Sequence, residues 1–457
     1  MITYSGEFQY LKADGKPIQA GPCRLSFDDD QITLAPRSGP PLAFDLGDID
    51  VFLPGDYDLS LTLYHGNKLS LSHFAKAFQD LNHDLLEAYR KRLIQCLLLE
   101  DLGEIARFDG FARVEGPTGS FSSAAEFRLY KSNLAILPTA ATGLQWRLAD
   151  IDAINFDQDG WATILECGDG RLTVTRLAKR TEEFKQRIEQ AASEVRERSA
   201  RAVRDLFPFL PAGDFQQVAA SLREGRAASV AALKAIDPRT EQALVVNVVD
   251  ATLKPYFDVL MEHLAPGELY AGFKMIRPDE ERETLSDAGV VSGESAYPTS
   301  TSDEAVDSGE DGPAPPDGQE APVLHWFFFP LVTRPGARSP ANLVAWETTS
   351  ASGRATYFFR LLPPERAPQL QDSSQSSAII AAALRQLNRA IVLLNFRREP
   401  IYLPDESLDL QARFHRYAIA RRKIPELRRL RSSFLGRAIH TSPEAWQKQF
   451  ENYLAQA

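Results

Sequence analysis

The chain has 457 residues, too many for one hydrophobic core, and this length predicts about two to four domains. Apolar residues make up 44% of the chain and charged residues 25%, which is typical of a folded globular protein that needs neither a disulfide nor a metal for stability. The net charge of −11 says little about partners, because the segment 279–320 holds thirteen acidic residues and one basic residue, and the rest is close to neutral.

Cysteine usage and hydropathy bear on the compartment. Cys23, Cys96 and Cys167 lie far apart among apolar residues, so we expect reduced core cysteines. Neither a CxxC nor an HxxxH pattern occurs, so no metal site is predicted. The start, Met1–Tyr4, does not resemble a secretory signal, and the longest apolar run, near Trp326–Phe329, is far shorter than the roughly 20 residues that cross a bilayer. We therefore expect a cytoplasmic protein without a transmembrane segment.

An internal repeat is the strongest signal in the sequence. Residues 42–52 read LAFDLGDIDVF and residues 144–154 read LQWRLADIDAI, an offset of 102 positions. Further apolar positions correspond at this offset or with one inserted residue: Ile32 with Leu134, Leu34 with Ile136, Leu69 with Leu172 and Leu71 with Val174. The matches keep the same order along the chain, which predicts two tandem copies of one module.

Each copy predicts several strands followed by one helix. Leu59, Leu61 and Leu63 alternate with polar residues, as in a half-buried strand, and residues 65–68 (HGNK) predict a turn before the alternation resumes. Residues 168–170 (GDG) predict the same hairpin in the second copy, because glycine tolerates positive φ. The closing helices show apolar stripes, formed by Phe74, Phe78, Leu81, Leu85, Tyr89 and Leu93 and by Leu177, Phe184, Ile188, Ala191 and Val195.

This pattern of about seven short strands closed by one amphipathic helix resembles the pleckstrin-homology-like (PH-like) superfold, over residues 4–98 and 106–200. The resemblance implies an α+β protein with two tandem PH-like β-barrels, each capped by a C-terminal helix. It also implies binding of lipid head groups, peptides or proteins rather than catalysis. Phosphoinositide-binding members cluster Lys and Arg between the first two strands. Here the first copy has only Lys12 and Lys16 there, beside Asp14, and the second copy has only Arg113, near Glu115, so lipid recognition is not expected.

The remaining chain predicts a mixed helical and antiparallel-sheet C-terminal half. Residues 203–264 predict helices, one capped by Asp214 and one from Thr240 to Leu264 that is apolar on most faces and buried between domains. Four strands are expected to form one antiparallel sheet, at residues 269–276, 324–331, 343–348 and 355–361. Residues 266–362 are also compatible with a third, divergent copy of the module.

A disordered acidic loop is expected inside that sheet, because residues 279–322 are rich in Ser, Gly, Pro, Asp and Glu. A helix is expected from Ser377 to Arg397, then an extended stretch at 401–403, and helices over 408–457. The expected divisions are 1–102 and 103–202 for the two modules, 203–278 for helices leading into the first C-terminal strand, 279–322 for the acidic loop, and 323–457 for the C-terminal strands and basic helices.

Catalytic motifs are not evident. The seven histidines are scattered, and no GxGxxG, GxxxxGK[ST] or nucleophile elbow occurs. Asp48 and Asp50 recur as Asp150 and Asp152, which suggests either paired carboxylates or the solvated face of a strand end. We favour the solvated face, because the acids flank Ile49 or its equivalent in an alternating pattern. No catalytic, cofactor-binding or metal-binding residue is predicted.

The region 385–437 is basic, with thirteen basic and five acidic residues. Its candidate partner-binding residues are Arg413, Arg416, Arg421, Arg422, Arg428, Arg429 and Arg431. They form either a surface for an acidic protein, nucleic acid or anionic membrane, or the solvated face of amphipathic helices. We also hypothesise that the acidic loop screens this region from anionic partners.

The expected function is therefore a non-catalytic cytoplasmic scaffold or adaptor that mediates protein–protein interaction without a cofactor. Two alternatives remain. One is an enzyme whose active site lies in the C-terminal half and leaves no linear motif. The other is a nucleic-acid or anionic-membrane binder that acts through the basic C-terminal helices.

Overall fold

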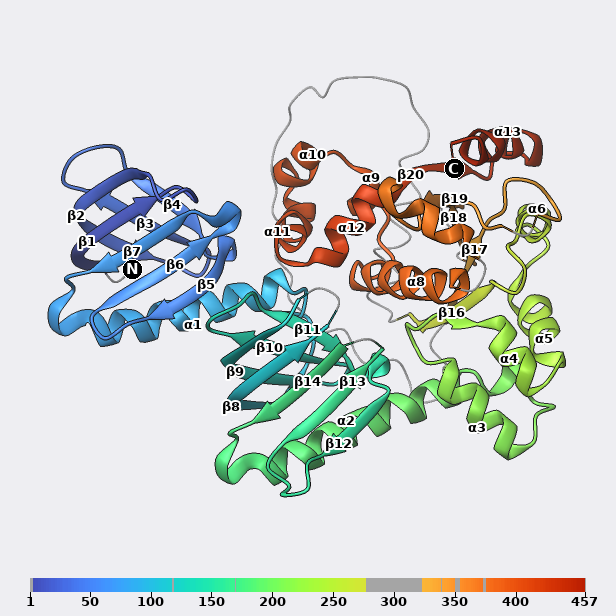
Figure 1. Cartoon of the computed structure of the whole chain (residues 1–457), viewed down its shortest axis with the longest axis horizontal. Coiled ribbons are helices and arrows are strands. Elements are labelled where there is room, and N and C mark those ends of the chain that lie inside the picture. The colour runs from blue at the N-terminus through green and yellow to red at the C-terminus, as the bar shows by residue number, and fades with distance from the viewer. Residues whose placement is uncertain are drawn as a thin grey trace, which may run out of the picture. The chain divides into compact units, whose positions relative to one another are not determined.

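The computed structural model describes residues 3–116, 119–168, 170–276, 323–337, 339–349, 354–372 and 375–456 of an α+β chain (Figure 1). Two compact units result. The first unit combines Met1–Arg201 with Ala381–Phe434, and the second combines Ala202–Ile380 with Leu435–Ala457. The acidic loop expected at 279–322, and its expected screening of the basic region, lie outside the described residues.

The first unit opens with two modules of seven antiparallel strands each, counted over the described residues (Figure 1). The first contains β1 (Thr3–Leu11), β2 (Pro17–Phe27), β3 (Gln31–Pro36), β4 (Leu42–Asp45), β5 (Ile49–Pro54), β6 (Asp58–Leu63), β7 (Lys68–Ser72) and α1 (Phe78–Cys96). The second contains β8 (Glu104–Glu115), β9 (Phe121–Tyr130), β10 (Asn133–Pro138), β11 (Leu144–Arg147), β12 (Ala153–Phe156), β13 (Thr163–Cys167), β14 (Gly170–Thr175) and α2 (Thr181–Ala202).

The strand order is the same in both modules. It is β4-β3-β2-β1-β7-β6-β5 in the first and β11-β10-β9-β8-β14-β13-β12 in the second. The repeat in the sequence therefore corresponds to a repeated structure, in which a helix follows the last strand each time. In both sheets the first strand of the module is the central strand, and it pairs with the second and the seventh strand.

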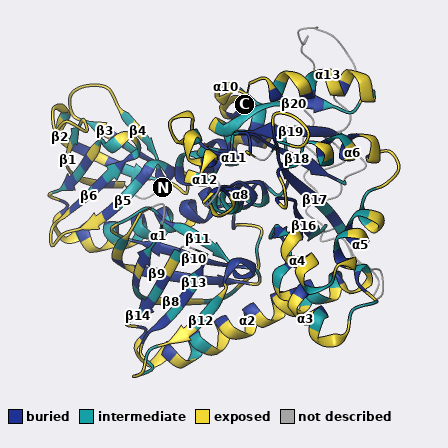
Figure 2. Cartoon of the chain, turned by 45° about the vertical axis from the view of Figure 1, so that its right-hand side comes forward, coloured by how far each residue is buried: buried dark blue, intermediate teal, exposed yellow. Residues whose placement is uncertain are grey.

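The cores of the modules follow from the two periodicities in the sequence. Leu59, Leu61, Leu69 and Leu71 are all 0% exposed, because alternate residues of a strand point to the same face. The two apolar stripes predicted for the helices are buried in full, while the opposite face of α2 is exposed (Figure 2). The predicted turn at residues 65–68 is also confirmed, since His65 and Gly66 have φ values of 69° and 81° between β6 and β7.

Short helices complete the first unit. They are the part of α8 (Ser376–Leu393) from Ala381 onwards, α9 (Glu399–Tyr402), α10 (Asp405–Leu410), α11 (His415–Lys423) and α12 (Pro425–Ser433). Of the extended stretch expected at 401–403, only Leu403 is extended. Ile401 and Tyr402 are helical instead, because Pro400 occupies the first turn of α9, where a missing N–H costs no helical hydrogen bond.

The second unit contains a six-stranded antiparallel sheet among its described residues. Its elements are α3 (Ala212–Ser221), α4 (Val230–Ile236), α5 (Arg239–Val248), α6 (Lys254–Glu262), β15 (Ala228–Ser229), β16 (Tyr270–Met275), β17 (Val323–Pro330), β18 (Val344–Thr348), β19 (Ala355–Phe359), β20 (Phe434–Ile439) and α13 (Pro443–Leu454). The strands β16 to β19 confirm the four predicted strands. The order runs consecutively from β15 to β20, so this sheet does not repeat the topology of the modules.

Three expectations for this unit are wrong. The single helix expected from Thr240 to Leu264 is broken between α5 and α6, where the Asp250 carboxylate accepts hydrogen bonds from the backbone N–H groups of Thr252 and Leu253. Its Val246 is 68% exposed rather than buried. Asp214 lies in the first turn of α3 and does not cap it. Residues 434–439, expected to be helical, form β20 at the edge of the sheet beside β19.

Gly47 allows the C-terminal helices to approach the first module. A Cβ at this residue would lie 2.9 Å from both Cys96 Sγ on α1 and Ile419 Cγ2 on α11. The equivalent residue of the second module is Ala149. Because a buried methyl group without space forces its neighbours apart, we expect Gly47→Ala to destabilise the first unit by about 1–3 kcal/mol, measured by calorimetry. Gly213→Ala is the control, since nothing lies within 4 Å of a Cβ there. It should not lower stability, and an equal loss would contradict the crowding argument.

Candidate functional site

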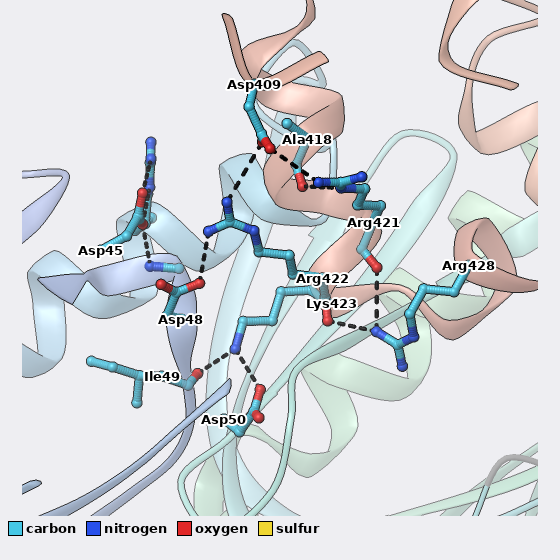
Figure 3. Close-up of polar contacts among 12 residues, drawn as sticks. Asp45, Asp48, Ile49, Asp50, Asp409, Ala418, Arg421, Arg422, Lys423 and Arg428 are labelled. Atoms are coloured by element: carbon cyan, nitrogen blue, oxygen red, sulfur yellow. Dashed lines mark hydrogen bonds and ion pairs between the residues drawn. The ribbon is translucent and has the colours of Figure 1, made fainter. Parts of the chain in front are cut away.

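The C-terminal end of α11 contacts the acidic motif of the first module, residues 48–50 (Figure 3). The Lys423 ammonium donates to Asp50 Oδ1 at 2.7 Å and to the Ile49 carbonyl at 2.6 Å, and its side chain is 0% exposed. Beside it, Arg422 donates to Asp48 Oδ1 at 3.0 Å. The basic residues at the end of α11 thus bind carboxylates located 373 and 374 positions earlier in the chain.

The equivalent motif of the second module meets α8. Asp150 lies 3.6 Å from Arg389 and 3.9 Å from Arg147, and it is only 8% exposed. Burial is the largest single influence and lowers the pKa of Arg389, but Asp150 and the other anionic groups nearby together outweigh it, so the pKa of that guanidinium is raised. The expectation that this acid lies on a solvated strand end is wrong, because a basic helix covers it. Both copies of the motif therefore bind basic side chains of the C-terminal helices.

The predicted partner-binding arginines mostly have partners within the first unit. Arg416 pairs with Asp101 at 3.0 Å, and Arg431 pairs with Asp405 at 2.7 Å. Arg421 pairs with Asp405. It also pairs with Asp409, and Arg422 lies 3.6 Å from the same carboxylate (Figure 3). These contacts join α10, α11 and α12 to each other and to the first module.

The other three predicted arginines differ. Arg428 is exposed and donates to the carbonyls of Arg421 and Arg422, at 3.2 and 2.6 Å (Figure 3). No carboxylate of the described residues pairs with it. Arg413 is exposed, lies over the Phe414 ring and donates to Gln411, while Arg429 lies half-buried on α12. Of the seven predicted residues, Arg422 and Arg428 line the cavity described next.

A cavity of about 570 Å³ lies in the first unit, within the range typical of ligand sites. It is lined by residues of both modules and of the C-terminal helices, namely 50–51, 64, 97, 114–116, 119–121, 141–147, 150, 167, 170, 382, 385–386, 389, 393, 422–426 and 428. Six of these residues are basic and four are acidic, so the lining carries an excess of positive charge. Such an excess favours an anionic ligand.

Two structural features shape this cavity. First, the whole of β11 lines it, and β11 is the edge strand of its sheet, paired with β10 alone among the described strands. Second, Arg385 and Arg389 stand one turn apart on α8. A Cβ at Gly168 would lie 3.5 Å from Arg385 Nε and 4.0 Å from Arg389 Nη2, so both guanidinium groups face the turn between β13 and β14. The cavity thus combines a strand edge with cationic side chains.

The described residues offer no group of His, Cys, Asp and Glu that could hold a metal ion. Cys23, Cys96 and Cys167 are buried thiols that form no disulfide, and Cys167 Sγ accepts a hydrogen bond from Arg389 at 2.7 Å. Among the described residues, no helix is both long enough and apolar enough to cross a membrane.

A buried polar network in the second unit bears on the expected alternative of an enzyme. The Thr356 hydroxyl donates to Glu347 Oε2 at 2.6 Å and accepts from the Trp446 indole N–H at 2.8 Å. His440 Nε2 lies 3.0 Å from this hydroxyl, and its ring stacks on Tyr256. Glu347 and Thr356 are 1% and 0% exposed, so these buried hydrogen bonds connect the sheet to α13.

Comparison with known proteins adds no family to these observations. No protein-family model matches the chain, and no curated protein matches it.

Proposed function

We propose that the protein is a non-catalytic cytoplasmic adaptor whose first unit binds an acidic, extended segment of a partner protein. The observation that carries this proposal is the cavity of about 570 Å³, in which the edge strand β11 stands beside arginines of α8 and α12. We further propose that both modules are PH-like domains. This second proposal is supported by the strand order, because each copy has the same order of seven antiparallel strands followed by a helix.

An edge strand favours an extended peptide as the ligand. Its outer backbone groups can pair with a peptide strand, which gives affinity through main-chain hydrogen bonds, while neighbouring side chains supply specificity. Residues 144–147 offer such an edge inside the cavity. A compact ligand of the same charge would leave this edge unused.

The cations of the cavity favour acidic side chains on that peptide. Lys423 and Arg389 already have Asp50 and Asp150 beside them. Among the described residues, the hydrogen-bond partners of Arg428 are backbone carbonyls. A carboxylate of a ligand would therefore add a charge-assisted hydrogen bond there. Arg385 contributes a further guanidinium to the lining.

The test is binding of a short fluorescein-labelled peptide of alternating Glu and Val to the full chain, followed by fluorescence anisotropy. We expect Arg385→Glu and Arg428→Glu each to weaken binding by about tenfold, which is a loss of about 1.4 kcal/mol in binding free energy. Each substitution replaces an attraction for the carboxylates of the peptide by a repulsion. Arg413→Glu is the matched control. It makes the same charge change at an exposed arginine outside the cavity, so its effect should stay below about twofold.

Three results would contradict the proposal. One is equal affinity for a peptide of alternating Gln and Val, which lacks the carboxylates. Another is an equal loss in Arg413→Glu, which would mean that general charge rather than the cavity attracts the peptide. The third is binding of single-stranded DNA or phosphatidylserine vesicles without binding of the peptide, which would favour the nucleic-acid or membrane alternative.

A further inference from the structure

Equivalent hairpins of the two modules expose large apolar side chains. In the first module the hairpin between β5 and β6 exposes Leu53 by 45% and Tyr57 by 80%. In the second module the hairpin between β12 and β13 exposes Phe156 by 39% and Trp161 by 64%. We name residues 53–58 tip 1 and residues 156–161 tip 2. The two hairpins occupy the same place in the strand order, so the exposure recurs with the repeat.

Internal contacts order both tips. In tip 1 the Gly55 N–H donates to the Asp58 carbonyl at 2.7 Å. In tip 2 the Asp157 carboxylate accepts from the Ala162 N–H at 2.7 Å, and Lys185 donates to the Gly160 carbonyl at 2.6 Å. A tip that is ordered before binding loses less conformational entropy when a partner docks.

Acidic residues lie close in the sequence to the exposed aromatic residue of each tip. Asp56 and Asp58 stand on either side of Tyr57, and Asp159 stands two positions before Trp161, with Asp157 at the base of the same turn. Among the described residues, none of these four carboxylates pairs with a basic side chain. Two interactions attract a cation to an aromatic ring near carboxylates: the electrostatic attraction of the ring quadrupole and the attraction of the negative carboxylates. The same carboxylates repel anionic lipid head groups and nucleic acid.

Tip 2 already holds a cation in this way. The Lys185 ammonium lies 5.0 Å from the centre of the Phe156 ring while it binds the backbone of the tip. Trp161 is 64% exposed, so one aromatic residue of the tip contacts an internal cation and the larger one faces solvent.

We propose that tip 1 and tip 2 each bind a Lys- and Arg-rich segment of a partner protein. A guanidinium or ammonium group of the partner lies over Tyr57 or Trp161 and pairs with a flanking carboxylate. The tips are distinct from the cavity, and their charge preference is opposite.

The test uses the full chain and a fluorescein-labelled peptide of alternating Gly and Arg, with fluorescence anisotropy as the readout. We expect Tyr57→Ser and Trp161→Ser each to weaken binding by about threefold, and the double variant by about tenfold. None of these variants changes the net charge, so general attraction of the peptide to an acidic chain is the same throughout. Val246→Ser is the matched control, because it removes an equally exposed apolar side chain from α5. It should bind like the parent.

Unchanged affinity in the double variant would overturn the proposal, as would an equal loss in Val246→Ser. Binding to phosphatidylserine vesicles that depends on Trp161, without binding of the peptide, would also overturn it by assigning the tips to a membrane. Arg385→Glu should leave the affinity for the Arg peptide within about twofold. The result is therefore independent of whether an acidic peptide enters the cavity.

Discussion

Replacing Lys423 by methionine is expected to lower the free energy of unfolding of the first unit by about 3 kcal/mol. The ammonium is 0% exposed and binds Asp50 Oδ1 and the Ile49 carbonyl, so the substitution leaves two acceptors without their donor. Asp50 is 28% exposed and can regain some hydration, which places the loss at the lower end of values for broken buried ion pairs.

Asp50→Ala is expected to cost more than Lys423→Met, because it leaves a positive charge where water does not reach. The double variant Asp50→Val with Lys423→Met should recover much of the loss, since a buried ion pair and an apolar pair of similar volume often have similar stability. Calorimetry of the full chain measures these changes, and hydrogen exchange of α11 locates them. Lys76→Met, at an exposed lysine, should stay within about 0.5 kcal/mol. A similar small effect of Lys423→Met would mean that α11 docks without this pair.

The second unit is expected to lose about 3 kcal/mol of stability between pH 7 and pH 4 through one histidine. Burial lowers the pKa of His325 on β17 to about 4, from an ordinary value near 6.5, and its Nε2 is buried without a hydrogen-bond partner. Between these two values the unfolded chain binds a proton at this residue and the folded chain does not. Stability therefore falls as the pH falls through this window, by about 1.4 kcal/mol per pH unit.

The variant His325→Leu isolates this contribution. The difference in unfolding free energy between the variant and the parent should be constant above pH 7. It should then change by about 1.4 kcal/mol per unit as the pH falls from 6.5 to 4, because titration of all other groups is common to both proteins. Urea unfolding at several pH values measures it. His325→Gln should show the same slope from a different starting value. Curves that stay parallel to the parent at every pH would contradict the buried neutral state.

Local periodicity in the sequence was enough to predict the modules. Alternating residues such as Leu59 and Leu61 predict strands, because each strand buries one face, and the helical stripe from Phe74 to Leu93 predicts α1. The repeat of LAFDLGDIDVF as LQWRLADIDAI then predicts that both copies share one arrangement, which their strand orders confirm. These patterns lie within short windows, so they can be recognised without knowledge of distant contacts.

Short segments were predicted less well than the repeated modules. Residues 434–439 contain no pattern that separates a strand from a helix, and pairing beside β19 decides for the strand. The four residues of α9 similarly depend on Pro400 at its first turn and on burial of Ile401. In such short segments local propensity is weak, and tertiary packing selects the conformation.

The candidate site depends on contacts that have no local signature. The recurring acids Asp50 and Asp150 were visible in the sequence, and so was the basic region, but nothing in either pattern says that they bind each other. Lys423 and Asp50 stand 373 positions apart, and the cavity joins β11 to helices of the opposite end of the chain. The sequence by itself determined the strands, the closing helices and the repeat, because these follow from periods of two and of 3.6 residues. Only the tertiary structure decided which charges are neutralised internally and which line a cavity, because that depends on chain segments brought together by folding.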